Sequence, residues 1–367
     1  MTSEKVPSGR RLRVGVIGCG EVTQVIHLPT LAQLADDFEV TALCDVDTTV
    51  LAAVGDAWSV DRRFTDAHEL VAQGDVDAVL VANPDAFHVE ATLAAIAAGK
   101  DVLVEKPMSL TLRGCDEIAA AAEREGAIVQ VGYMRRHAPA LAEAKRALEE
   151  LGEIRFARVH DLIGHNHLII NRTSRVVRGG GSAGSELAER RAGLVEEAIG
   201  TAPAPLVNAY GLLLGLGSHD ISAMRELLGR PRGVTSATLG HEGHYVAATL
   251  DYGSYACHFE TGVDEIPRFD AHIEVFGDKR VLRIQYDTPY VRNLPVRLTL
   301  LEANGRGGVV ERHIHPEWGD PFVHEWRAFA QHVRERSEPA ASAADYRNDL
   351  ELFAEMVELM AASEAVA

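Results

Sequence analysis

The sequence predicts a two-domain α/β protein: an N-terminal domain with a doubly wound parallel sheet, and a C-terminal α+β domain with a large, mostly antiparallel, open-faced sheet. The chain has 367 residues, more than one hydrophobic core usually supports. Up to about residue 135, continuous apolar runs alternate with helical patterns, whereas strand patterns dominate residues 233–312. We therefore expect one domain over residues 1–136 and a second over residues 137–367.

The N-terminal elements follow from five apolar runs, which are typical of parallel strands buried on both faces. The runs are LRVGVIG, FEVTALCD, DAVLVANP, DVLVEKP and IVQVGYM. Helical patterns separate them, and one of these, HVEATLAAIAAG, ends at Gly99, a frequent helix C-terminal stop. Strands and helices in strict alternation predict the doubly wound sheet.

The C-terminal elements have a different texture. A helix over residues 140–151 leads into the strand EIRFARVHDLIG, and two helices are expected over residues 185–199 and 209–228. Strand patterns joined by short turns such as DYGS and FGDK then predict antiparallel hairpins. The tail, residues 321–363, has the pattern of two amphipathic helices.

Composition excludes several function classes. With 36 Lys and Arg against 54 Asp and Glu, the net charge of −18 repels nucleic acids and anionic membrane surfaces, so we expect a small-molecule partner instead. No apolar run approaches the roughly 18 residues of a membrane span, and the N-terminus lacks a signal-peptide core. The four cysteines do not have metal-ligand spacing, and most lie in apolar contexts, so we expect reduced thiols and a cytoplasmic location.

The stretch VGVIGCGEVT predicts a dinucleotide-binding turn. Gly18 and Gly20 allow a tight turn and close approach to a diphosphate, while Glu21 and Val22 open the following helix. Thr23 replaces the third glycine of the fingerprint. The alternative is a plain strand-to-helix turn.

Asp45 ends the second predicted strand, where a carboxylate can accept hydrogen bonds from both ribose hydroxyls and repel a 2′-phosphate. The sequence therefore predicts NAD, rather than NADP, as the cofactor. The alternative is that Asp45 only caps the next helix.

The stretch VLVEKPMSL places Glu105 and Lys106 at the carboxyl end of a buried strand, where ligands of this sheet type bind. A lysine there can exchange a proton with a substrate hydroxyl, and the positive charge of a nicotinamide would lower its pKa. The alternative is an ion pair at the end of a strand.

Four stretches together are similar to one family of oxidoreductases. They are VGVIGCGEVTQVIHLPTL, VANPDAFHVEATLAAIAAGKDVLVEKPMSLT, VQVGYMRRHAP and GLGSHDISAMRELLG. On these stretches the chain resembles the glucose-fructose oxidoreductase, inositol dehydrogenase and rhizopine-catabolism (Gfo/Idh/MocA) family, closely over the N-terminal half and loosely beyond it. The resemblance implies an NAD-binding Rossmann domain, action on sugars, cyclitols or their derivatives, and a homodimer or homotetramer formed through the C-terminal sheet.

The same resemblance assigns roles to single residues. It implies that Lys106 and His219 are catalytic, with His219 as the acid–base at the reacting hydroxyl. It places Asn83, Pro84 and His88 beside the nicotinamide ribose and Arg135 on the cofactor side of the cleft. The full predicted cofactor set is Gly18, Gly20, Glu21, Val22, Asp45, Asn83, Pro84, His88, Glu105, Lys106 and Arg135.

The sequence departs from the inositol dehydrogenases of this family at Gly215, four residues before His219, where those members carry an aspartate. One interpretation is drift. The other is a remodelled site, because glycine removes a negative charge and opens space beside His219.

The segment over residues 159–181 follows the first strand of the second domain, a place where the resemblance implies substrate contacts. Asp161, His165, Asn166 and His167 could bind sugar hydroxyls or supply the missing partner of His219. Three arginines recur at every third position, and such a cluster could hold an anionic substrate group; they are Arg172, Arg175 and Arg178. The alternative is a surface loop with solvated arginines.

We expect no metal site. The histidines of HEGHY and ERHIHPEW lack the i, i+4 spacing of a helical zinc site. Three functions remain open: an NAD-dependent dehydrogenase of a sugar, sugar acid or cyclitol; a glycoside hydrolase that oxidises its substrate transiently and then returns the hydride; and a non-catalytic NAD-binding regulator. The first is favoured, and retention of Lys106 and His219 argues against the third.

Overall fold

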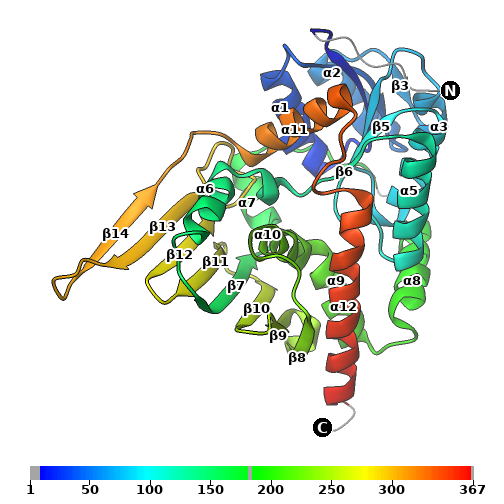
Figure 1. Ribbon diagram of the computed structural model, residues 1–367. Helices are drawn as coiled ribbons and strands as arrows, with labels where there is room; N and C mark the ends of the chain where they lie inside the picture. Colours follow the sequence, from blue (N-terminus) through cyan, green and yellow to red (C-terminus); the bar gives the residue numbers. More distant parts are fainter. Residues whose placement is uncertain (1–8, 181–183, 365–367) are drawn as a thin grey trace. The chain divides into compact units, whose positions relative to one another are not determined.

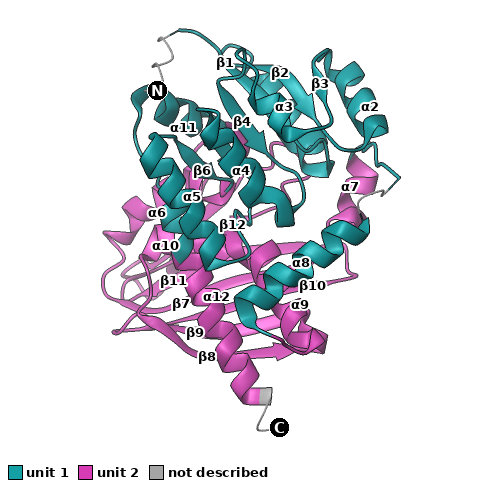
Figure 2. Ribbon diagram, turned by 90° about the vertical axis from the view of Figure 1, so that its right-hand side faces the viewer, with its two compact units in different colours: residues 1–132, 174–200, 325–347 teal, residues 133–173, 201–324, 348–367 magenta. Residues whose placement is uncertain are grey.

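A computed structural model describes residues 9–180 and 184–364 of the chain (Figure 1). The chain divides into two compact units (Figure 2). Unit 1 contains residues 1–132, 174–200 and 325–347, and unit 2 contains residues 133–173, 201–324 and 348–367. The first crossing lies close to the predicted boundary at residue 136. Two later segments, which the sequence assigned to the second domain, belong to unit 1 instead.

Unit 1 is built on a six-stranded parallel sheet with the order β3-β2-β1-β4-β5-β6, which is the order of a dinucleotide-binding sheet. Its strands are β1 Leu12–Ile17, β2 Phe38–Cys44, β3 Arg63–Phe64, β4 Ala78–Val81, β5 Asp101–Val104 and β6 Val129–Val131. Every residue of β4 and β5 is buried, as expected where helices cover both faces of a sheet. The predicted Rossmann fold is confirmed.

The helices of unit 1 alternate with these strands, and others arrive from later in the chain. They are α1 Leu28–Gln33, α2 Thr48–Trp58, α3 Ala67–Val71, α4 His88–Ala97, α5 Leu112–Glu125, α8 Gly184–Ile199, most of α11 Pro321–Glu335 and the first turn of α12 Ala343–Glu364. Gly126, in the left-handed conformation, ends α5 as a C-terminal cap.

The tail segment completes the core of unit 1. Trp326 of α11 is fully buried, and its ring meets Phe38 of β2 edge-on, with 5.2 Å between centroids. The backbone N–H of Val131 donates to the carbonyl of Ala341 at 2.8 Å, so the tail also pairs with β6. This apolar and backbone contact is why residues 325–347 fold with unit 1 rather than with the domain that precedes them.

Unit 2 is built on an eight-stranded sheet with the order β14-β13-β12-β11-β7-β10-β9-β8, antiparallel except where β7 pairs with β10. The strands are β7 Ile154–Gly164, β8 Gly233–Gly240, β9 Tyr245–Asp251, β10 Ala256–Asp264, β11 Phe269–Gly277, β12 Arg280–Tyr286, β13 Arg297–Ala303 and β14 Val309–Ile314. Burial alternates along β10 and β12, which indicates a sheet with one covered face. The predicted α+β fold is confirmed.

The helices of unit 2 are α6 Pro139–Leu148, α7 His167–Thr173, α9 Ala204–Leu212, α10 Ser218–Leu228 and most of α12. Contacts of α10 with β7, and of α6 with β12, place these helices against the sheet. The helix expected over residues 209–228 is interrupted by a π-helical turn, Leu213–Gly217.

Among the residues that the structure describes, no single helix is long and apolar enough to cross a membrane. The stretches Gly184–Ile199 and Ala204–Leu228 together have the length and composition for it, but they are bent by 93°.

Candidate functional site

The glycine-rich turn after β1 has the geometry of a dinucleotide-binding loop. Gly18 has a φ of +95°, and a Cβ there would lie 2.4 Å from the backbone nitrogen of Asn83, so only glycine fits. A Cβ on Gly20 would meet nothing within 4 Å, which leaves open space beside the loop. The hydroxyl of Thr23 donates to the carbonyl of Gly18 at 2.6 Å and closes the turn in place of the third glycine.

Asp45 is held at the end of β2 by the backbone. Its two carboxylate oxygens accept hydrogen bonds from the N–H groups of Cys19 and Asp47, both at 2.8 Å. The alternative that Asp45 caps the next helix is wrong, because Asp47 is the residue that accepts from the first turn of α2. Asp45 therefore links the end of β2 to the glycine-rich turn.

These residues fit a nicotinamide dinucleotide. The Oδ1 atom of the Asn83 side chain, next to Gly18, is buried without a hydrogen-bond partner in the described part of the chain. A buried polar atom with no partner in the protein is often satisfied by a ligand or water. Together with the space at Gly20 and the fixed carboxylate of Asp45, it marks the edge of the sheet where a cofactor would bind.

A segment from far along the chain lies against the glycine-rich turn. We call residues 174–180 the strap; it belongs to unit 1. The side-chain amide of Gln24 bonds both backbone groups of Val177, at 2.8 and 2.9 Å, and Arg178 forms an ion pair with Glu21 at 2.5 Å. The N–H of Gly180 donates to Asp47 at 3.0 Å. Glu21 thus faces the strap.

The three arginines that the sequence placed in one substrate-binding cluster fall in both units of the chain. Arg172 belongs to unit 2, whereas Arg175 and Arg178 belong to unit 1. Arg178 is engaged with Glu21 at the predicted cofactor loop. Binding of an anionic substrate group by these three side chains stays a prediction.

Lys106 follows a buried carboxylate that has hydrogen-bond donors on both oxygens. Glu105 lies 2.8 Å from Nε2 of His27 and accepts the backbone N–H of Lys106 at 3.1 Å. The indole N–H of Trp326 donates to Nδ1 of His27 at 3.1 Å, so Nδ1 carries no proton and Nε2–H donates to Glu105. This chain, Trp326 to His27 to Glu105, holds the backbone at Lys106.

The pKa of Glu105 lies below its usual value. Burial alone raises it, but the hydrogen bond from His27 and the positive charge of Lys106 lower it by more. Glu105 therefore favours its anionic form beside Lys106. The Lys106–Pro107 peptide is cis.

His88 lies behind the predicted cofactor loop rather than on its surface. The ring is only 2% exposed, and its two nitrogens lie 2.8 Å from the carbonyl of Pro107 and 2.7 Å from that of Asn83. His88 ties the loop after β4 to the loop after β5, so the structure places it as a support for both. Pro84, in the loop after β4, is exposed.

His219 lies in the first turn of α10 in unit 2, half-buried, with the ring of Tyr133 edge-on at 6.4 Å between centroids. The preceding π-helical turn widens the helix, so Gly215 and His219 are not stacked as a regular i, i+4 pair. A Cβ on Gly215 would meet nothing within 4 Å. Glycine at this position therefore leaves open space, as the remodelled-site interpretation requires.

The residue after His219 belongs to a buried charge cluster in unit 2. The guanidinium of Arg135 bonds Asp161 at 3.0 Å and Asp220, and its CZ atom lies 4.9 Å from the ring centre of Tyr286. Arg135 is 3% exposed and both aspartates are fully buried. Arg135 and Asp161 are thus held in internal ion pairs. Their roles in cofactor binding and substrate binding stay predictions.

Burial raises the pKa of Asp220 well above its usual value; Arg135 opposes the rise and Asp161 adds to it. Two carboxylates share one guanidinium here, so one of them is driven toward the protonated form. The cluster is then close to neutral, which suits its buried position.

The other predicted substrate residues lie just after β7. The rings of His165 and His167 stack, with 5.4 Å between centroids, and His165 lies 3.4 Å from the carboxylate of Glu265. Asn166 follows in the same turn and is half-buried. A contact of this segment with His219 stays a prediction.

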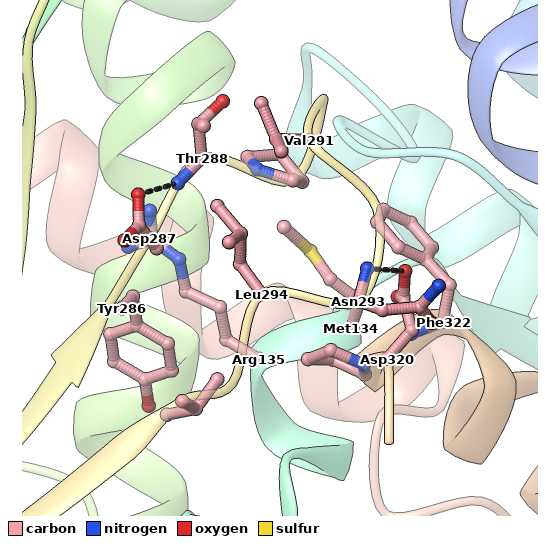
Figure 3. Close-up of a pocket in the computed structure, with 13 residues that line it drawn as sticks. Met134, Arg135, Tyr286, Asp287, Thr288, Val291, Asn293, Leu294, Asp320 and Phe322 are labelled. Carbon is pink, nitrogen blue, oxygen red and sulfur yellow. Dashed lines mark hydrogen bonds between the residues drawn. The ribbon is translucent and has the colours of Figure 1, made fainter. Parts of the chain in front are cut away.

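A cavity in unit 2 was not predicted from the sequence. Figure 3 shows Arg135 and Tyr286 on one side and Asp320 and Phe322 on the other. Its empty volume, part of which is open to solvent, is about 390 Å³.

Comparison with known proteins decides the family. Residues 12–133 match the model of an oxidoreductase family with an NAD-binding Rossmann fold, GFO_IDH_MocA. The N-terminal part of the chain therefore carries the NAD-binding domain of the Gfo/Idh/MocA family. The resemblance inferred from the sequence motifs is therefore confirmed, as is the NAD-binding class of the first unit.

Named relatives within the Gfo/Idh/MocA family are inositol dehydrogenases. The chain is 38% identical to inositol 2-dehydrogenase 2 of Saccharopolyspora erythraea over 139 residues, which cover 38% of this chain and 41% of that protein. It is 28% identical to myo-inositol 2-dehydrogenase of Thermotoga maritima over 348 residues, 91% of this chain and 92% of that one. With the first of these the match spans less than half of the relative's length.

Solved structures of other proteins share the fold over almost the whole chain. A levoglucosan dehydrogenase in complex with NADH has a TM-score of 0.75 and 17% identity, covering 96% of this chain and 98% of that one. KijD10, a 3-ketoreductase from Actinomadura kijaniata in complex with NADP and TDP-benzene, has a TM-score of 0.73 and 23% identity at the same coverage. At these identities the likeness establishes the fold alone.

Proposed function

We propose that this protein is an NAD-dependent oxidoreductase that transfers a hydride between nicotinamide and a carbinol carbon of a sugar, sugar acid or cyclitol. The observation that carries the proposal is the arrangement at the end of β5, where buried Glu105, held by His27, fixes the backbone of Lys106. Ligands of doubly wound sheets bind at that edge. The names of the relatives, dehydrogenases of inositol and of levoglucosan, support the substrate class.

In the proposed reaction each residue of the chain has a limited task. The turn at Gly18 and Gly20 binds the cofactor diphosphate, and Asp45 accepts hydrogen bonds from the ribose hydroxyls. The cofactor supplies the hydride acceptor when it is bound. Lys106 and His219 exchange the hydroxyl proton of the substrate, so that oxidation removes one hydride and one proton.

The test of catalysis is replacement of the two proposed acid–base residues. Lys106→Ala and His219→Ala should each lower kcat by about 10² to 10⁴-fold, the usual contribution of a general acid or base. The dissociation constant of NADH, measured by fluorescence, should change little in either variant. His313→Ala, at an exposed strand edge, is the control. A normal rate for His219→Ala would move the proton transfer to another group, with His165 and His167 the next to replace.

The cofactor preference has a separate test. If Asp45 binds the ribose hydroxyls, NADP should bind at least tenfold more weakly than NAD, a difference of about 1.4 kcal/mol. Asp45→Ser should narrow that gap. Equal affinity of the unaltered protein for both cofactors would contradict the role of Asp45.

The redox-neutral glycoside hydrolase has no support from the relatives, which are named as dehydrogenases and a ketoreductase. The substrate panel separates the two reactions. Growth of reduced cofactor in proportion to substrate is expected for the dehydrogenase, with myo-inositol and levoglucosan first in the panel. Cleavage of a glycoside with catalytic NAD and no net reduction would favour the hydrolase.

Assembly into a homodimer or homotetramer through the C-terminal sheet is part of the same proposal. Its support is the edge strand β14, where Val309 is 69% and Val310 38% exposed, because exposed apolar edge strands tend to pair with another chain. Light scattering with size-exclusion chromatography tests it, and a monomer at all concentrations would contradict it.

A further inference from the structure

Two histidines and an aspartate meet on the sheet of unit 2, on the face away from α10. His160 of β7 stands directly opposite His272 of β11, and Asp270 lies two residues before His272 on the same strand. Because side chains alternate along a strand, His160 points away from its neighbour Asp161, which pairs through Arg135 with Asp220 of α10. The three side chains offer one ligand atom each, all within 4.8 Å of one another.

The ring nitrogens are arranged as in a carboxylate–histidine–metal site. His160 directs Nε2 toward Asp270 at 3.5 Å and Nδ1 toward Glu260 at 3.0 Å. His272 directs Nδ1 toward Asp270 at 3.2 Å and Nε2 toward Glu274 at 3.7 Å. Each ring therefore has one nitrogen facing the shared aspartate and the other facing a glutamate that can fix the tautomer, which is how metal-binding histidines are usually oriented.

The guanidinium of Arg283 lies against the histidine–aspartate cluster. Nη2 of Arg283 lies 3.2 Å from Nδ1 of His272. The same Nδ1 also lies 3.2 Å from the carboxylate of Asp270, so it faces both a hydrogen-bond donor and an acceptor. A metal ion at this position requires the neutral ring with its lone pair on Nδ1. The Arg283 side chain is 40% exposed, so it can turn into solvent when another cation takes its place.

We propose that His160, Asp270 and His272 form a binding site for a divalent transition-metal ion, of which Zn²⁺ is the test case. The ligands are Nε2 of His160, the carboxylate of Asp270 and Nδ1 of His272, with water in the fourth position. Zinc bonds of about 2.0–2.2 Å in a tetrahedron place ligand atoms roughly 3.3–3.5 Å apart. The separations to Asp270, 3.2 and 3.5 Å, are in this range but run to its two different oxygens, and the two rings stack with 4.8 Å between centroids. The rings and the carboxylate must therefore reorient to bring all three ligand atoms onto one ion. Imidazole ligands favour zinc over magnesium or calcium.

The site is independent of the proposed redox reaction, and its test is a binding measurement on the full chain. Protein treated with a chelator and dialysed is titrated with ZnCl₂ by isothermal calorimetry, and one tight site per chain is expected. His160→Ala and His272→Ala should each weaken that site by more than tenfold. Loss of a glutamate behind a ligand typically costs about 10–100-fold in affinity, so Glu260→Gln should do the same.

Arg283→Gln provides the contrast with a plain hydrogen-bonded network. Removing the resident cation should tighten zinc binding, whereas in a network without a metal it has no reason to create affinity. His241→Ala and His313→Ala, which alter histidines outside the cluster, serve as matched controls and should leave the tight site intact. Circular dichroism checks the fold of each variant.

The proposal is overturned if the unaltered chain shows no tight site. It is equally overturned if the double variant His160→Ala/His272→Ala binds zinc as the unaltered chain does, since the ion would then lie elsewhere. If the histidine variants do not fold, Glu260→Gln and Arg283→Gln decide: weaker and tighter binding, respectively, support the site, and no change in either contradicts it.

Discussion

Each of the two proposed catalytic residues adjoins a buried carboxylate, and the two carboxylates have opposite pKa shifts. In unit 1 Glu105 precedes Lys106, and its pKa is lowered. In unit 2 Asp220 follows His219, and its pKa is raised. Both side chains are buried, so desolvation acts in the same direction on both. The difference comes from their partners.

Glu105 receives hydrogen bonds from His27 and from the backbone of Lys106, and no other acid of the described residues shares these donors. Asp220 competes with Asp161 for a single guanidinium. The comparison teaches that burial does not decide the charge of a carboxylate; the ratio of donors to acids around it does. Lys106 thus follows a carboxylate that favours its charged form, whereas the residue after His219 is a carboxyl group that favours its protonated form.

The strongest test of this comparison removes the one cation of the unit 2 cluster. Arg135→Met should lower the free energy of unfolding by about 3–5 kcal/mol, because it leaves two buried aspartates without a partner. Urea unfolding at neutral pH measures it. Arg158→Met, at a side chain 45% exposed, is the control and should cost at most about 1 kcal/mol. Equal losses in both variants would contradict the cluster.

The network of unit 1 carries fewer charges, so its disruption should cost less. Trp326→Phe keeps the apolar ring but removes the donor to His27, which leaves a buried nitrogen unsatisfied at a cost of about 1–3 kcal/mol. The same urea experiment measures this variant, with Trp318→Phe, at a residue 79% exposed, as the control. Indistinguishable stability of the two variants would show that the indole N–H has no structural role.

The opposite pKa shifts predict opposite pH dependences. The raised pKa of Asp220 gives stability that is complete below its usual value of 3.8 and is lost as the pH rises through the folded-state pKa. The free energy of unfolding of Asp220→Asn should therefore rise relative to that of the unaltered protein as the pH rises, by up to about 1.4 kcal/mol per pH unit. Glu105→Gln should show the opposite dependence. The unaltered protein should be more stable to unfolding than this variant above pH 4.5, and the difference should shrink as the pH falls. Slopes of the same sign would refute the comparison.

The smallest effect concerns an exposed pair. Arg178→Ala breaks the ion pair between the strap and Glu21. The side chain of Arg178 is 52% exposed and that of Glu21 is 33% exposed. Such pairs contribute less than about 1 kcal/mol, so the dissociation constant of NAD should rise by less than about fivefold. Fluorescence titration measures it beside Arg172→Ala, which alters an arginine of unit 2. A loss above tenfold would make the strap a main part of the cofactor site.

The sequence predicted the features that are local in the chain. The parallel strands follow from continuous apolar runs, the turn at Gly18 from its glycine pattern, and Glu105 with Lys106 from the strand that precedes them. Each depends on residues close together in sequence, where periodicity and turn chemistry are informative. The family followed from the same local motifs.

What the sequence did not predict depends on distant partners. The amphipathic pattern of the tail does not indicate that Trp326 donates a hydrogen bond to His27. The local sequence around Arg135 does not indicate that two aspartates pair with it. The spacing of the arginines did not indicate that Gln24 pairs with the backbone of Val177, or that Arg178 meets Glu21 at the glycine-rich turn. His160 and His272 become neighbours only through strand register, which their separation of 112 positions in the sequence conceals.

The route of the chain through unit 1 also bears on its synthesis. The ribosome delivers Gly132 long before Glu325, and at about 5–20 residues per second the interval is roughly 10–40 s. Until Trp326 emerges, Phe38 has no indole against it, and β6 lacks its hydrogen bond from Val131 to Ala341. The nascent N-terminal sheet therefore carries an apolar seam and an unpaired edge, the features that holding chaperones bind. We expect a fragment that stops at residue 132 to aggregate rather than to behave as a free NAD-binding domain.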